Sequence, residues 1–125
     1  DLRLGEVCVV RSDYFADLGG WRGDHLDRFD STVYRALDFE LPFLGVAGAT
    51  VTTACTPLVD YCDVQVETME GAALYMVCRE YGVAALGLRS ISNYIDTPRE
   101  RWQIPEAVEA LGRALDTTLD LMSGR

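Results

Sequence analysis

The stretch Val66–Asn93, VETMEGAALYMVCREYGVAALGLRSISN, decides the fold class. Its apolar residues recur at helical spacing from Met69 onward, which predicts an amphipathic helix over residues 68–81. Gly82 then fits the position just after the last helical turn. The continuous apolar run Val83–Leu88 indicates a strand buried on both faces. A strand, a helix and a strand in succession are typical of an α/β fold.

Further elements are predicted on both sides of this stretch. Strands are expected at Glu6–Arg11, Ala49–Thr53 and Val64–Val66, with a short apolar run at Phe43–Val46. A last helix is expected to start near Pro105, a residue suited to the first helical turn. The whole pattern supports one α/β domain over residues 1–125.

A long polar and glycine-rich stretch runs from Asp13 to about Phe39. Connections of this length are usually binding loops, lids or segments that contact a partner. We therefore expect a loop with a role in binding or assembly here.

Composition excludes several classes of function. The 125 residues are 49% hydrophobic and carry a net charge of −9, which argues against nucleic acid and anionic membranes as partners. All 11 basic residues are Arg, so Schiff-base and Walker-type lysines are absent. The single histidine, His25, cannot build a multi-histidine metal centre.

The four cysteines show no Cys-x-x-Cys pair and stand among apolar neighbours, at positions Cys8, Cys55, Cys62 and Cys78. This pattern is typical of buried free thiols in a reducing compartment and indicates a cytoplasmic protein. A disulfide between Cys55 and Cys62 is the alternative.

The first place where chemistry can reside is the segment Glu67–Ala73. A carboxylate at a strand-to-helix junction is followed by Gly71 and two alanines, so a ligand can approach the helix start closely. Such a carboxylate can accept two hydrogen bonds from a diol, such as the ribose hydroxyls. The alternative is structural: Glu67 and Glu70 complement the helix dipole, and the small residues allow tight packing.

The second place is Leu88–Tyr94, where polar residues follow a buried strand directly. In open α/β sheets ligands bind at the carboxyl ends of strands, and the Asn93 amide offers an acceptor and two donors in one plane. The alternative is an ordinary strand end with turn-forming Ser and Asn. Because both segments lie on one strand–helix–strand unit, we expect them to share one site.

These two segments also carry a family resemblance. Met69–Ala73 (MEGAA) followed by Arg89–Asn93 (RSISN) resembles the signature of the nucleoside phosphorylase/hydrolase superfamily, and within it that of the futalosine hydrolases. Phe15–Gly19 and Trp102–Ile104 agree with it in order along the chain. The resemblance implies a three-layer α/β sandwich. Since nothing matches the family's N-terminal half, residues 1–125 are expected to be the C-terminal part of such a domain.

On the sugar side, the resemblance implies that Met69 packs against the ribose and that Glu70 binds its hydroxyls. Glu67 is expected nearby, also binding substrate. The spacing Glu-Thr-Met-Glu is one residue longer than the Glu-Met-Glu of adenine-specific relatives.

On the base side, the resemblance makes Asn93 the catalytic residue that faces the purine, where adenine-specific relatives carry Asp. An amide can accept from a protonated N7 and donate to O6, which suits a 6-oxopurine. Arg89 is expected to anchor the strand end or orient neighbouring polar groups. Thr53, with Thr52 before it, is expected near the base pocket.

The resemblance implies hydrolysis of a 6-oxopurine nucleoside such as futalosine, releasing hypoxanthine, in menaquinone biosynthesis. It implies no metal and no organic cofactor, and a homo-oligomer with residues 13–24 at the subunit contact. Two alternatives stay open: a purine or uridine phosphorylase, and a non-catalytic module that binds a nucleoside or a partner.

Overall fold

The computed structural model describes residues 2–53 and 63–124. The elements in chain order are β1 Val7–Asp13, β2 Gly19–Arg22, β3 His25–Arg28, β4 Tyr34–Arg35, β5 Leu44–Thr50, β6 Val66–Thr68, α1 Gly71–Glu80, β7 Gly87–Ser90, the 3-10 turn η1 Arg99–Arg101 and α2 Ile104–Met122. In this part of the chain no helix is both long and apolar enough to cross a membrane.

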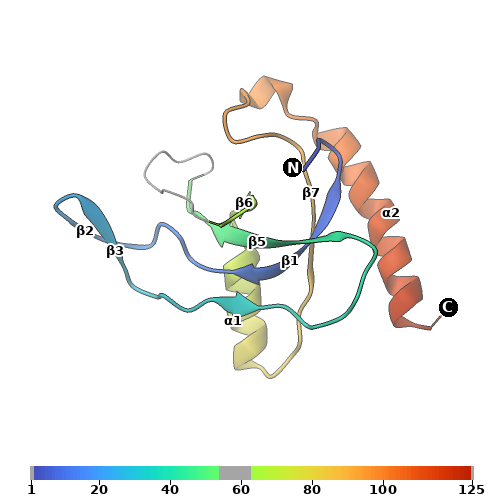
Figure 1. The fold of residues 1–125 in the computed structure, drawn as a ribbon, viewed down its shortest axis with the longest axis horizontal. Helices are drawn as coiled ribbons and strands as arrows, with labels where there is room; N and C mark the ends of the chain where they lie inside the picture. Colours follow the sequence, from blue (N-terminus) through green and yellow to red (C-terminus); the bar gives the residue numbers. More distant parts are fainter. Residues whose placement is uncertain (1, 54–62, 125) are drawn as a thin grey trace.

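The central sheet is mixed, and β1 is its middle strand. β5 pairs parallel to β1, and β6 pairs parallel to β5. On the other side of β1, β7 pairs antiparallel along residues 7–10 and β4 pairs antiparallel at Ser12 and Asp13. Figure 1 shows α1 crossing the sheet and α2 running beside β7. The predicted α/β class is confirmed.

The core forms where α1 meets the sheet. Residues from β1, β4, β5, β6 and α1 make one buried cluster: Cys8, Val10, Tyr34, Val46, Val66, Ala72 and Tyr75. The Tyr75 hydroxyl donates to the Val10 carbonyl and accepts from the Gly87 N–H at 2.9 Å. This side chain therefore ties α1 to both β1 and β7.

Two predicted strands have different bounds from those expected. Leu44–Val46 of the first apolar run and Ala49–Thr50 of the strand expected at Ala49–Thr53 belong to one strand, β5, which pairs with both β1 and β6. In the run Val83–Leu88 only the last residues are in a strand, and Val83 is 58% exposed. Residues 83–86 connect the end of α1 to the sheet, and pairing with β1 begins only at Gly87.

The predicted helix is confirmed, although it starts at Gly71. Gly82 adopts the expected left-handed conformation, with φ of 67°. The buried face is centred on Ala72 and Tyr75, whereas Val77 is 49% exposed. The face is rotated from the expected one because Tyr75 carries the hydroxyl that bridges two strands.

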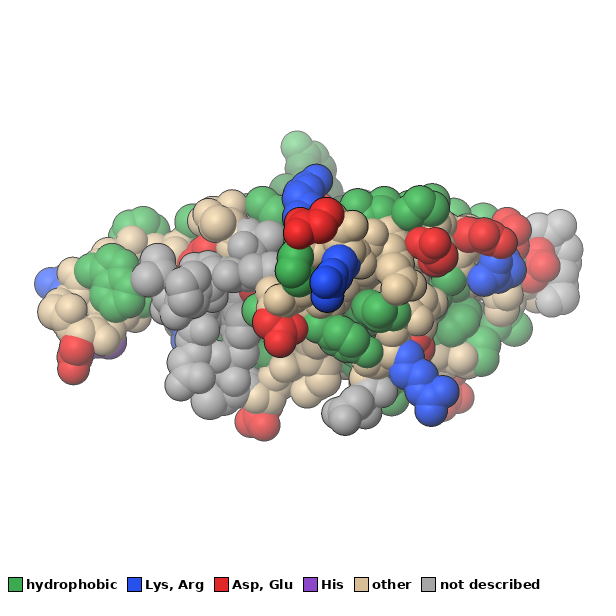
Figure 2. Space-filling model, turned by 90° about the horizontal axis from the view of Figure 1, so that it is seen from above, with side chains coloured by type: hydrophobic (Ala, Val, Ile, Leu, Met, Phe, Trp, Pro, Cys, Tyr) green, Lys and Arg blue, Asp and Glu red, His purple; other side chains and the backbone are tan. Residues whose placement is uncertain are grey.

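The polar stretch between residues 13 and 39, expected as a loop, contains a β-hairpin. β2 and β3 pair antiparallel around Gly23 and Asp24, and Gly23 has φ of 74°. A glycine in that conformation suits a two-residue hairpin turn. Figures 1 and 2 show the hairpin projecting from the body of the molecule.

Two cysteines are described, and both are free: Cys8 is buried and Cys78 is partly buried. Burial raises the pKa of the Cys8 thiol to about 11. Cys55 and Cys62 lie outside the described residues, so the alternative disulfide stays a prediction.

Candidate functional site

A pocket of about 1000 Å³ lies between the β6–α1 junction, the end of β7 and the η1 segment. Five of the six predicted site residues line it: Glu67, Met69, Glu70, Arg89 and Asn93. The two segments singled out in the sequence therefore meet at one cavity. A smaller cavity of about 420 Å³ lies between β4 and the second half of α1 and holds none of these five residues.

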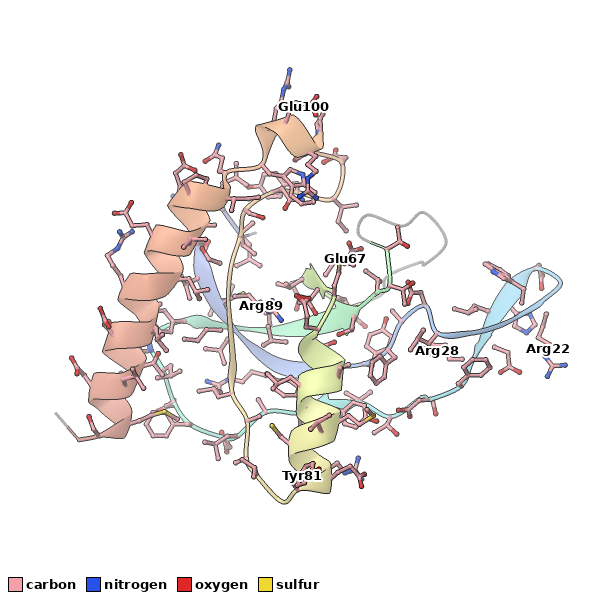
Figure 3. The ribbon with its side chains drawn as sticks, turned by 180° about the vertical axis from the view of Figure 1, so that it is seen from behind. Arg22, Arg28, Glu67, Tyr81, Arg89 and Glu100 are labelled. Atoms are coloured by element: carbon pink, nitrogen blue, oxygen red, sulfur yellow. The ribbon has the colours of Figure 1, made fainter. Side chains whose placement is uncertain are left out.

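The β6–α1 junction sends its side chains in two directions. In β6, Val66 and Thr68 are buried while Glu67 is only partly buried and lines the pocket, as strand alternation requires. Met69 is 51% exposed and offers an apolar surface at the pocket wall. Figure 3 shows Glu67 just before the start of α1 and Arg89 on β7, and both residues line the pocket.

Glu70 occupies the N-cap position of α1, but its side chain makes no capping hydrogen bond. Other groups cap the helix: the Gly71 N–H donates to Thr68 Oγ1 at 3.1 Å, and the Ala72 N–H donates to Thr50 Oγ1 at 2.8 Å. The Glu70 carboxylate, exposed at the pocket, is therefore not used to cap the helix.

The Asn93 amide is held by its neighbours. The Ser92 hydroxyl donates to Asn93 Oδ1 at 2.7 Å, and Asn93 Nδ2 donates to the Tyr94 carbonyl at 3.0 Å. An amide has two acceptor lone pairs and two donor hydrogens, so one of each remains for a ligand. The backbone is fixed as well, because the Gln103 N–H donates to the Ser92 carbonyl at 2.7 Å.

Arg89 belongs to β7, where it pairs with Cys8, and its side chain lines the pocket. It faces a wall that also carries two glutamates, so the described wall holds charges of both signs. A guanidinium in this place can bind an anion or orient a carboxylate.

Thr53 does not join the other predicted residues. It is exposed and is not among the described residues that line the pocket. The N–H and hydroxyl of Thr52 both donate to Asp17 Oδ2, at 2.7 and 2.9 Å. These bonds tie the end of β5 to the segment after β1.

The sequence argument placed Asn93 just after the carboxyl end of its own strand, and Asn93 does follow the carboxyl end of β7. Because β7 runs antiparallel to β1, Asn93 lies beyond the amino end of β1, whereas Met69 follows the carboxyl end of β6. The cavity nevertheless brings them together because it extends across the sheet, from Leu44 at the start of β5 to the start of α1.

Other described residues that line the pocket were not predicted as site residues, among them Leu2, Tyr94, Arg99 and Trp102. The Arg99 guanidinium lies 4.9 Å from the centre of the Trp102 ring, and Trp102 Nε1 donates to the Thr97 carbonyl at 3.0 Å. The Tyr94 hydroxyl donates to the Leu2 carbonyl at 3.1 Å. In the sequence, the only sign that these residues belong to the site was the presence of two aromatic residues, Tyr94 and Trp102, shortly after the polar end of the predicted strand.

No group of three or more His, Cys, Asp or Glu side chains that could hold a metal ion occurs within residues 2–53 and 63–124.

The family model described as "Phosphorylase superfamily" matches residues 59–121, which is half of the chain. No curated protein sequence matches significantly.

Three solved structures share the fold. An MTA/SAH nucleosidase superposes with a TM-score of 0.67 at 17% identity, covering 99% of this chain and 57% of its own. An MTAN variant from Chlamydia trachomatis with bound MTA gives 0.63 at 13% identity, covering 98% and 58%. A futalosine hydrolase mutant of Helicobacter pylori strain 26695 gives 0.62 at 16% identity, covering 95% and 61%. This chain thus spans less than two thirds of each of the three.

Proposed function

The chain belongs to the phosphorylase superfamily, and on that premise we propose that it carries the sugar- and base-binding side of a purine nucleosidase site. The substrate is a 6-oxopurine ribonucleoside. The site is the pocket between the start of α1 and the segment that follows β7.

The observation that carries the proposal is the side chain of Glu70, which lines the pocket and makes no capping hydrogen bond to α1. The Glu70 side chain does not cap α1, because Thr50 and Thr68 accept from the first helix N–H groups. A carboxylate at a pocket wall can accept hydrogen bonds from both hydroxyls of a ribose. Met69, half exposed at the same wall, supplies an apolar surface for the sugar ring.

The orientation of Asn93 supports the choice of base. Its remaining acceptor and donor match a protonated N7 and the O6 of hypoxanthine. As the bond between C1′ and N9 breaks, the sugar becomes oxocarbenium-like and negative charge builds on the base. A fixed amide donor stabilises that charge without having to reorganise.

We further propose that residues 1–125 are the C-terminal part of a larger domain and that another part supplies the group that activates water. The proposal is supported by the share of the three nucleosidase structures that this chain spans, 57–61%. Glu67 and Arg89 would then complete the polar wall around the sugar and the base.

Futalosine hydrolysis in menaquinone biosynthesis is the substrate and pathway we propose. One of the three structural neighbours is a futalosine hydrolase, and the amide of Asn93 fits the hypoxanthine that futalosine would release. The free thiols of Cys8 and Cys78 support a reducing, cytoplasmic setting.

We propose a homo-oligomer whose contact includes the β2–β3 hairpin. Trp21 is 52% exposed and Phe29 is 83% exposed on or next to this projecting ribbon. Aromatic side chains so exposed are enriched at protein interfaces.

Titration of the chain with inosine and adenosine tests the base preference, and we expect inosine to bind more tightly. Equal binding, or a preference for adenosine, would overturn the choice of base. Following base release by the protein of the complete gene, with and without phosphate, separates hydrolysis from phosphorolysis. Release that depends on phosphate would identify a phosphorylase.

A further inference from the structure

Asp13 is a fully buried carboxylate at the end of β1, with 0% exposure. Its Oδ1 accepts from the Tyr14 N–H at 2.8 Å and from the Thr50 hydroxyl at 2.8 Å. Its Oδ2 has no hydrogen-bond partner among the described residues. Burying a carboxylate costs folding free energy, and an oxygen without a hydrogen bond adds to that cost. A buried Asp at this position therefore calls for a structural or functional explanation.

The unpaired oxygen lies against the start of α1. A Cβ atom on Gly71 would overlap Oδ2 of Asp13, and one on Gly48 would lie 2.9 Å from it. Gly71 is the first residue of α1, where the helix dipole favours a negative charge. The first turn of α1 contains no acidic residue of its own. Asp13 places an anion there from a neighbouring strand.

A chain of hydrogen bonds links the first N–H groups of α1 to Asp13 through two threonine hydroxyls, and each donor in it points toward Asp13. The Thr50 hydroxyl gives its single proton to Asp13, so its oxygen can only accept from the Ala72 N–H. Thr50 and Thr68 Oγ1 are 3.3 Å apart, and the same reasoning makes Thr68 the donor between them. Thr68 Oγ1 in turn accepts from the Gly71 N–H.

This network holds the residues on either side of Met69 and Glu70, the two residues proposed to bind the sugar. Thr68 and Gly71 are both fixed by it, and only Met69 and Glu70 stand between them. We propose that Asp13 is a positioning residue, which holds the Thr68–Gly71 backbone through Thr50 and so directs Glu70 at the ribose. The inference rests on the proposed function of Glu70.

Replacement of Asp13 by Asn tests the proposal in titrations with inosine and with hypoxanthine. The Asn side chain keeps one acceptor but turns a donor toward Thr50 or toward the helix N-terminus. We expect inosine binding to weaken about tenfold while hypoxanthine binding stays unchanged, because only the nucleoside contacts Glu70. A loss of packing alone would weaken both ligands alike.

Asp30→Asn is the control, because Asp30, like Asp13, accepts from a side-chain hydroxyl, in its case that of the buried Tyr34 at 2.6 Å. It should leave both affinities unchanged. Thr50→Val keeps the Asp13 carboxylate but removes the hydroxyl that links it to the helix start, so it should weaken inosine selectively too. It serves as the second test if Asp13→Asn does not fold.

The results separate this inference from the function on which it rests. Where Glu70→Gln weakens inosine but neither Asp13→Asn nor Thr50→Val does, the positioning role is wrong and the sugar site stands. Where Glu70→Gln itself has no effect on inosine, both are wrong.

Discussion

The backbone N–H of Ala72 donates a hydrogen bond to the hydroxyl of Thr50 at 2.8 Å, so a strand residue caps the first turn of α1. The consequence falls on Glu70, the N-cap residue, whose side chain makes no capping hydrogen bond. Because Thr50 of β5 caps the helix, the Glu70 carboxylate is not needed for capping and lies at the edge of the pocket.

Thr50→Val should lower the free energy of unfolding by about 1–3 kcal/mol, because the isosteric side chain leaves the buried Ala72 N–H without its acceptor and removes one of the two hydrogen bonds to Asp13 Oδ1. Thr50→Ser keeps the hydroxyl and should cost clearly less. Denaturant unfolding measures both. Thr117→Val, which removes an exposed hydroxyl on α2, is the control and should change little. Equal stability of Thr50→Val and the parent would contradict the capping network.

Tyr75 and Gly87 should be coupled. A Cβ on Gly87 would lie 2.7 Å from the Tyr75 hydroxyl and 3.5 Å from Cζ, so Gly87→Ala forces the hydroxyl to move. Tyr75→Phe alone should cost about 1–3 kcal/mol, since the Val10 carbonyl and the Gly87 N–H lose their partner. In the Phe background Gly87→Ala should cost much less than in the parent. A double-mutant cycle of unfolding free energies checks this, and additive costs would refute it.

Asn93→Asp should move the base preference from hypoxanthine toward adenine by about tenfold or more. A carboxylate can accept from the 6-amino group of adenine, whereas it repels O6 and loses the donor that Asn93 offers. The ratio of the dissociation constants for inosine and adenosine measures the effect. Gln103→Glu makes the same chemical change at a residue that does not line the pocket and should leave the ratio alone. An unaltered ratio in Asn93→Asp would remove Asn93 from the base site.

The stability of the protein should depend on pH through Asp13. Burial raises the pKa of this carboxyl above 3.8, partly offset by the hydrogen bonds from Thr50 and Tyr14 and by the charge of Arg89. With the folded pKa above the unfolded one, the contribution of Asp13 is fully present below about 3.8 and is lost as the pH rises through the folded pKa. The unfolding free energy of the parent minus that of Asp13→Asn should therefore decrease from pH 4 upward. An increase over that range would show that the folded pKa is lowered instead.

The helix α1 and the strand β1 could be predicted because local residue patterns determine them. The spacing of Ala72 and Met76 predicted α1, and the β-branched run around Val9 predicted β1. The hairpin was missed because its strands are only four residues each and polar, with Gly23 as the one conformational signal.

The side-chain chemistry of the sequence predicted several pocket residues, but it did not predict the contacts that hold them in place. Asp13 follows a strand and resembles an ordinary turn residue, and its partner Thr50 stands 37 positions further along the chain. The antiparallel direction of β7 is likewise set by a long-range pairing with β1 that no local pattern encodes. Burial and hydrogen bonding between distant segments therefore had to come from the structure.

The most direct test asks whether Glu70 and the ribose hydroxyls recognise each other. Inosine and 2′,3′-dideoxyinosine are titrated into the parent, into Glu70→Gln and into Glu80→Gln, the last a matched change at the far end of α1. Hydrogen bonds to a charged group contribute about 1.5–3 kcal/mol, so removal of the hydroxyls should weaken binding to the parent and to Glu80→Gln roughly tenfold to a hundredfold. For Glu70→Gln the two ligands should bind almost equally. The same loss of affinity in all three proteins would contradict the proposed sugar site.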